Sequence, residues 1–94
     1  MKTRVIFRVY KGELLALFPA VSGTVNKPWH CSCYAHVGQH SACNPSEVMR
    51  HSRAATRAEY QDLARELRRT GYTLQIVKRI VRADYDARVK ELAR

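Results

Sequence analysis

One helix is specified more strongly than any other element of this chain, and it limits the folds that the chain can adopt. Residues 56–59, Thr-Arg-Ala-Glu, match the S/T-x-x-E capping box, in which two side chains satisfy backbone N–H groups at the helix start. Apolar side chains then recur at i, i+3, i+4 and i+7, which predicts a helix of about fourteen residues with one apolar stripe. Gly71 suits the left-handed C-cap. The stripe, which must pack against another element, consists of Tyr60, Leu63, Ala64 and Leu67.

The N-terminal residues predict an antiparallel hairpin. Residues 2–10 alternate apolar and charged side chains with a period of two, which is typical of a strand. Lys11-Gly12 is a turn signal, and residues 13–18 predict a second strand that stops at Pro19. Because residues 14–18 are apolar on both faces, we expect this second strand to be central or covered.

Three further elements follow from shorter signals. Asn44-Pro45 supplies an N-cap and a first-turn proline for a short helix that ends near His51. Residues 72–81 are rich in β-branched side chains and predict a third strand. Residues 83–93 predict a last helix, with Tyr85, Val89 and Leu92 on one side and the i,i+4 pairs Asp84–Arg88 and Asp86–Lys90 on its surface.

These elements predict an α+β fold in the order β-β-(short α)-α-β-α, with a three-stranded antiparallel sheet and helices packed mainly on one face. Residues 1–94 form a single domain, and the C-terminal helix of about residues 83–94 is an appended element. A chain this short buries only roughly 60–65% of its unfolded surface, so a deep catalytic pocket is not expected, and neither is an enzyme. The predicted core consists of Val5, Phe7, Leu15, Leu17, Leu63, Leu67, Leu74 and Ile76.

The chain is strongly basic, with 17 Lys and Arg against 8 Asp and Glu, and most of the positive charge falls after Met49. Arg57, Gln61, Arg65 and Arg68 recur at i, i+4, i+8 and i+11 and therefore form a stripe on the central helix. Such a stripe is typical of salt-dependent binding to phosphates. The predicted partner surface consists of Arg50, Arg53, Arg57, Arg65, Arg68, Arg69, Lys78, Arg79 and Arg82.

An alternative for the same stripe is a solvated helix face, in which Asp62 and Glu66 pair with Arg65 and Arg69. The sequence contains no aromatic RNP pattern, GXXG loop or paired helix-turn-helix signature, so it does not predict sequence-specific recognition. The partner class is nucleic acid, a nucleoprotein complex or an acidic host protein.

The segment His30–Cys43, HCSCYAHVGQHSAC, is dense in soft metal ligands. A zinc site would draw on Cys31, Cys33, His36 and His40, with Cys43 as a further thiolate. The C-x-C spacing and the local origin of all ligands count against zinc, so no cofactor is predicted. A Cys–His nucleophile pair from the same residues is a second alternative. The third is a loop pinned by Tyr34, Val37 and Cys31, with histidines hydrogen-bonded to the backbone.

The sequence also predicts a location. The first ten residues alternate in character, no apolar signal-peptide core follows, and no apolar run approaches the ~20 residues of a transmembrane helix. An odd number of cysteines argues against a disulfide framework. We expect a cytoplasmic protein that does not bind membranes, in a reducing bacterial host cell.

The sequence contains the five strings VIFR, ALFP, CSCYAHVGQH, EYQDLARELRRTGY and IVKR. Through these strings the chain resembles a family of small uncharacterised proteins of bacteria, phages and other mobile elements. The resemblance covers residues 1–80, and its most specific part is the motif Y-x-H-V-G-Q-H. The resemblance implies no catalytic residues. At the position of Cys43, members of the family more often have a small residue. The residues that match the family motif are Cys31, Tyr34, His36, Gly38 and His40.

Three functions are compatible with these features. The first is a non-enzymatic phage or mobile-element protein whose basic surface binds nucleic acid or a nucleoprotein complex. The second is an inhibitor of a host defence system, similar to anti-CRISPR proteins, that acts by protein–protein binding, which the mobile-element resemblance implies. The third is a small zinc-stabilised module.

Overall fold

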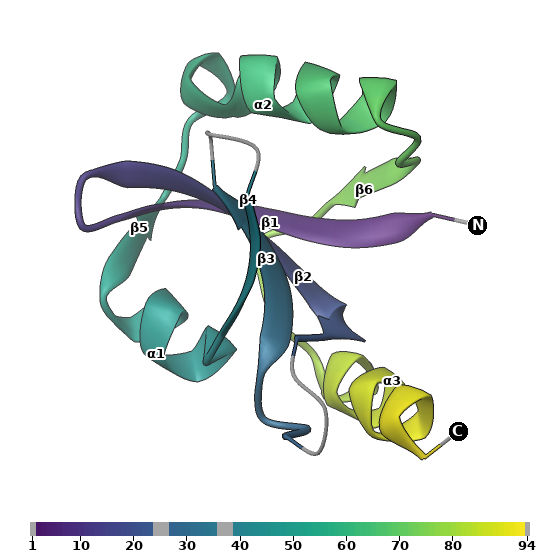
Figure 1. The fold of residues 1–94 in the computed structure, drawn as a ribbon. Helices are drawn as coiled ribbons and strands as arrows, with labels where there is room; N and C mark the ends of the chain where they lie inside the picture. The colour runs from purple at the N-terminus through teal and green to yellow at the C-terminus, as the bar shows by residue number, and fades with distance from the viewer. Residues whose placement is uncertain (1, 24–26, 36–38, 94) are drawn as a thin grey trace.

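The N-terminal half of the chain folds as an antiparallel meander that forms most of one sheet. The computed structural model describes residues 2–23, 27–35 and 39–93. The sheet has the strand order β4-β3-β2-β1-β5, and β6 pairs with β1 beside β5 (Figure 1). The elements are β1 (Thr3–Tyr10), β2 (Glu13–Ser22), β3 (Cys31–Ala35), β4 (Gln39–Cys43), α1 (Pro45–Arg50), β5 (Ser52–Ala54), α2 (Arg57–Arg69), β6 (Leu74–Ile76) and α3 (Arg82–Leu92).

The α+β class is confirmed, but the prediction of a three-stranded sheet is wrong. Six strands form within the described residues, because residues 31–35 and 39–43 pair as a hairpin and residues 52–54 add a short edge strand. The predicted third strand, residues 72–81, shrinks to Leu74–Ile76. It pairs with β1 in the parallel direction, whereas the other five strands pair antiparallel.

The predicted β1–β2 hairpin is confirmed, and its turn uses positive φ angles at Lys11 (52°) and Gly12 (78°). The predicted stop at Pro19 is wrong, since β2 continues to Ser22. The pairing of β2 with β3 shifts register between Phe18 and Ser22, and Pro19 lies within this irregularity. A proline, which has no N–H to donate, is tolerated in a strand at such a site.

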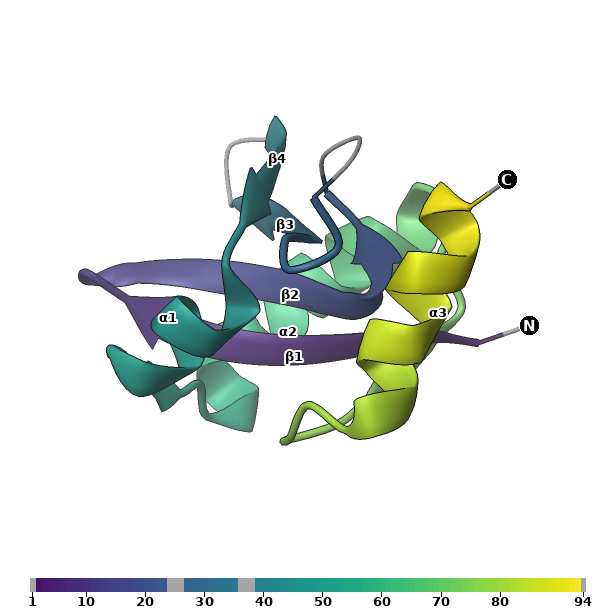
Figure 2. The same cartoon turned by 90° about the horizontal axis from the view of Figure 1, so that it is seen from below.

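Helices cover both faces of the sheet, so the prediction that they pack on one face is wrong. Alternate residues of β1 point in opposite directions: Val5 and Phe7 contact α2, whereas Ile6 belongs to a second cluster with Val48 of α1. Helix α3 packs against β2 on the side away from α2 (Figures 1 and 2). The two apolar faces of β2 explain this arrangement, because each face needs its own cover.

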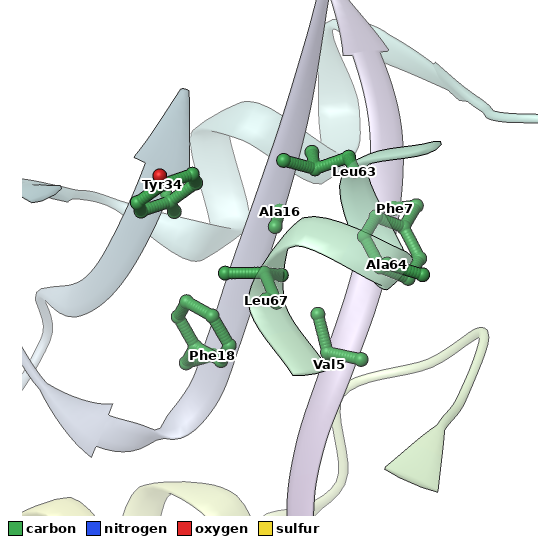
Figure 3. Packing of buried hydrophobic residues seen from close by; sticks show 8 residues of the cluster. All are labelled: Val5, Phe7, Ala16, Phe18, Tyr34, Leu63, Ala64 and Leu67. Carbon is green, nitrogen blue, oxygen red and sulfur yellow. The ribbon is translucent and has the colours of Figure 1, made fainter. Parts of the chain in front are cut away.

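The capped helix is confirmed as α2, with both hydrogen bonds of its capping box between Thr56 and Glu59. Gly71, just beyond it, has a φ of 112°. The apolar stripe of α2 packs on the sheet, and two aromatic pairs extend this contact. Phe7 stacks on Tyr60 at 4.5 Å, and Phe18 stacks on Tyr72 at 5.1 Å, between ring centroids. Figure 3 shows the cluster of Val5, Phe7, Ala16, Phe18, Tyr34, Leu63, Ala64 and Leu67.

Five of the eight predicted core residues are buried, and the other three are partly exposed. Leu15 and Leu74 are half-buried and Ile76 is 38% exposed. Ile76 is the last residue of β6, at the edge of the sheet, and part of its side chain is exposed there. The buried members of the predicted set are Val5, Phe7, Leu17, Leu63 and Leu67.

Helix α1 begins as predicted, since the Asn44 side chain accepts hydrogen bonds from the N–H groups of Ser46 and Glu47. Helix α3 occupies its predicted position, but its polar side faces the sheet and its predicted apolar side faces solvent. Its buried residues are Asp84 and Arg88, while Tyr85 and Val89 are about 40% exposed.

The predicted ion pairs of α3 are also replaced by others. Asp84 accepts from Arg4 of β1 at 2.7 Å instead of pairing with Arg88. Arg88 instead donates to the backbone carbonyls of Pro19 and Pro28. Asp86 pairs with Arg82 at 3.3 Å and not with Lys90. Polar contacts with distant segments therefore determine which side of α3 faces the sheet.

Candidate functional site

A groove of about 290 Å³ runs along the solvent side of α2, next to β6. Helical periodicity places three of the predicted arginines and one glutamine along it, and exposed Ile76 of β6 contributes its other wall. The predicted stripe is thus one concave surface. The residues that line it are Arg57, Tyr60, Gln61, Ala64, Arg65, Arg68 and Ile76.

The arginines of this groove are weakly paired or without a carboxylate partner among the described residues. Among the described residues, neither Arg57 nor Arg68 forms a salt bridge. Arg65 lies 3.1 Å from Asp62, but both side chains are more than 60% exposed. Exposed pairs of this kind contribute only about 0–1 kcal/mol and are screened by salt. An incoming phosphate can therefore compete for Arg65.

Other predicted basic residues are not part of this groove. Arg53 makes a two-bond contact with Glu59, at 2.8 and 2.7 Å, and Arg82 is paired with Asp86. Arg50 ends α1, while Arg69 and Arg79 are exposed but line no part of the groove. Glu66 and Arg69, both in the described part of the chain, do not form the expected pair; Glu66 accepts instead from the Tyr34 hydroxyl at 2.7 Å.

A second, smaller hollow of about 110 Å³ adjoins the basic groove, and it was not predicted from the sequence. Tyr60 and Ile76 line both spaces. Lys78, a predicted partner-binding residue, lies on the second hollow. No residue pattern marks this place, because it depends on where two short strands end.

A pocket of about 440 Å³ lies on the other flank of α2 and is a poorer candidate for a polyanion. Its polar lining is acidic, from Glu13, Glu59 and Asp62, so it would repel phosphate. Helix α2 therefore presents an acidic flank toward the β1–β2 turn and a basic flank toward β6.

The contact between Arg53 and Glu59 is expected to make the stability of the fold depend on pH. The Arg53 guanidinium and then the Thr56 backbone N–H lower the pKa of Glu59 to about 2. A carboxylate with a lowered folded-state pKa adds stability above its unfolded pKa and loses it as the pH falls toward the folded value. We expect Glu59→Gln to be less stable than wild type at pH 7, with the difference shrinking between about pH 4.5 and 2. Urea titrations of both proteins across that range measure it; a constant difference would contradict the pairing.

The predicted metal ligands are divided between the two faces of the sheet. Cys31 and Cys33 are buried in the cluster on the α1 side. His40 lies opposite Tyr34, whose ring is in the α2-side cluster, at 4.7 Å between ring centroids. His36 lies outside the described residues. Within the described part of the chain, no three His, Cys, Asp or Glu side chains are grouped closely enough to hold a metal ion.

Two residues of the Y-x-H-V-G-Q-H motif have a structural role in the described part of the chain. Besides its contact with Tyr34, His40 places Nε2 3.1 Å from the Tyr72 hydroxyl, just after α2. The Tyr34 hydroxyl donates to Glu66 of α2, and this contact raises the pKa of Tyr34. The motif thus joins the β3–β4 hairpin to α2 and so supports the helix that bears the groove.

The contacts and burial of the cysteine thiols predict that they react slowly with electrophiles. Cys31 and Cys43 lie opposite each other with sulfurs 3.8 Å apart, and this contact, with burial, raises the pKa of Cys43 to about 12. Contact with Cys43 and burial likewise raise the pKa of Cys33. Since the thiolate is the reactive form, we expect Cys33 and Cys43 of the native protein to react with iodoacetamide at least a hundredfold more slowly at pH 7.5 than in urea, because their raised pKa values leave a smaller thiolate fraction. Mass spectrometry of timed samples measures this, and rapid modification of either cysteine in the native protein would contradict it.

No protein-family model, curated protein or solved structure matches the chain. The resemblance to mobile-element proteins therefore stays a prediction. No helix in the described residues is long and apolar enough to cross a membrane.

Proposed function

We propose that this protein binds nucleic acid without catalysis, through the groove along α2. The observation that supports this most is the placement of Arg57, Arg65 and Arg68 on one face of a capped, well-packed helix, with two of them free of carboxylate partners among the described residues. Arginine forms two-bond contacts with phosphate and stacks on bases, so it suits this partner better than lysine would.

The contacts are with the backbone of the nucleic acid more than with base edges. A groove on the solvent side of a helix beside a sheet presents guanidinium groups that recognise phosphate, which is common to all sequences. Neutralising about three phosphates of a single strand gives a slope of log affinity against log salt near −2. Affinity should then fall on the order of tenfold between 50 and 200 mM salt.

The experiment is fluorescence anisotropy of a labelled oligonucleotide at several salt concentrations. We expect Arg57→Glu/Arg68→Glu to lower affinity at low salt by at least about tenfold and to flatten the salt slope, because two phosphate contacts are lost. The matched control is Lys27→Glu/Lys90→Glu, which changes net charge equally at exposed positions outside the groove. The proposal fails if wild type does not bind at low salt, or if both double variants lose the same affinity.

A second candidate, an inhibitor of a host defence system acting by protein–protein binding, is favoured by a different observation. The outward side of α3 exposes Tyr85 and Val89, each about 40%, next to Val81 at 46%. Exposed apolar patches often mark protein interaction sites. A pulldown from nuclease-treated host lysate tests it: one protein captured by wild type and lost with Tyr85→Lys/Val89→Lys would favour this function over nucleic-acid binding.

A further inference from the structure

The second hollow lies where one edge of β1 is left without a strand partner. Strand β5 pairs with β1 over Arg8–Tyr10, and β6 pairs with it over Thr3–Val5. Ile6 and Phe7 lie opposite the break between these two short strands, and both line the hollow. The chain closes the two ends of the break, since Ala55 N–H donates to the Phe7 carbonyl and Val77 N–H to the Val5 carbonyl.

This hollow is apolar inside and positively charged at its rim. Its lining is mostly apolar and comes from side chains such as Phe7, Ala54 and Val77, while Lys78 stands at its edge. Tyr60 forms the wall between it and the arginine groove, with its ring stacked almost parallel, at 9°, on Phe7. A cationic track for phosphates and an apolar slot beside an aromatic pair therefore lie side by side.

The size of the slot limits what can enter. An apolar cavity of about 150 Å³ holds one benzene ring. A hollow of about 110 Å³ that is open to solvent therefore fits a single six-membered ring and is too small to enclose the two fused rings of a purine. Binding of bases in an aromatic-lined slot next to a cationic groove is how single strands are held.

We infer that the ligand of this site is single-stranded nucleic acid, with its phosphates along Arg57, Arg65 and Arg68 and one pyrimidine base in the hollow beside Tyr60. The inference rests on the proposed function and names its substrate class. Arg57 and Arg68 are separated by about 16 Å of helix, a length that several nucleotides span. A duplex keeps its bases stacked and paired, and extracting one costs free energy, so single strands are favoured.

The test compares three labelled ligands of about fifteen nucleotides: oligothymidine, oligodeoxyadenosine and an abasic strand with the same number of phosphates. We expect oligothymidine to bind about tenfold more tightly than the abasic strand and more tightly than oligodeoxyadenosine. Ala54→Leu fills the hollow from an exposed position and should remove the advantage of oligothymidine while leaving abasic binding unchanged. Ala58→Leu, exposed on α2 but lining neither space, is the matched control.

The outcomes separate this inference from the proposed function. Equal, salt-dependent binding of oligothymidine and the abasic strand overturns the base slot and leaves phosphate binding standing. A duplex that binds as tightly as oligothymidine overturns it in the same way. Binding of polyglutamate but of none of the strands overturns both, and assigns the surface to an acidic peptide.

Discussion

Replacing Asp84 with alanine is expected to lower the free energy of unfolding by about 3 kcal/mol. The Asp84 side chain is only 1% exposed and accepts two hydrogen bonds from the Arg4 guanidinium, at 2.7 and 3.2 Å. It also accepts from the Val81 N–H at 2.9 Å, at the start of α3. Alanine would leave Arg4 without its carboxylate and the helix without its cap. Because the Arg4 side chain is 25% exposed, water recovers part of the loss, which places the expected effect at the low end for broken buried pairs.

Urea unfolding followed by circular dichroism measures this effect. Asp86→Ala is the matched control on the same helix, since Asp86 and its partner Arg82 are both at least 60% exposed. Exposed pairs contribute little, so the control should stay within about 0.5 kcal/mol of wild type. Similar stabilities for the two variants would show that Asp84 does not hold α3 on the sheet.

The fold could be predicted from sequence where the signals were local. The capping box of α2, the Asn44 cap of α1 and the Lys11-Gly12 turn each lie within a few residues of the structure they specify. The β3–β4 hairpin was missed because its strands are five residues each and rich in Cys, His and Ser, with no apolar alternation. Strands β5 and β6, of three residues each, are too short for any periodicity to detect.

Helix α3 shows why the remaining predictions failed. Its apolar residues Tyr85 and Val89 predicted the buried side, but Asp84 and Arg88 face the sheet instead. Their partners are Arg4 and the carbonyls of Pro19 and Pro28, about sixty or more positions away in sequence. A satisfied buried polar contact can outweigh an amphipathic pattern, and it is visible only once the chain has folded.

The candidate site also has a part that local sequence predicts and a part that depends on the folded chain. Arg57, Arg65 and Arg68 follow from helical spacing alone, and the structure places them on one groove. Arg53 could not be separated from them by sequence, because its two-bond contact with Glu59 joins β5 to α2. The hollow beside Tyr60 requires the break between β5 and β6, which no local pattern predicts.

Replacing Arg88 with methionine is expected to destabilise the fold by about 2–3 kcal/mol while leaving the affinity of the folded protein for nucleic acid unchanged. Arg88 is 4% exposed, and its guanidinium donates to the carbonyls of Pro19 and Pro28. Methionine fills much of the same space but donates no hydrogen bond, so these carbonyls lose their partner at a cost of about 1–3 kcal/mol each when buried. Lys90→Met, at an exposed position of α3, is the control and should have little effect.

The two readouts of this variant test whether α3 and the groove are independent. Helix α3 and α2 lie on opposite faces of the sheet (Figure 1), and Arg88 lines neither the groove nor the adjoining hollow. Loss of a cation on α3 therefore removes no phosphate contact, and anisotropy at a temperature where the variant stays folded should give the wild-type affinity and salt slope. A lower affinity of the folded variant would instead place the nucleic-acid surface on α3, because a guanidinium whose hydrogen bonds go to carbonyls keeps its full positive charge.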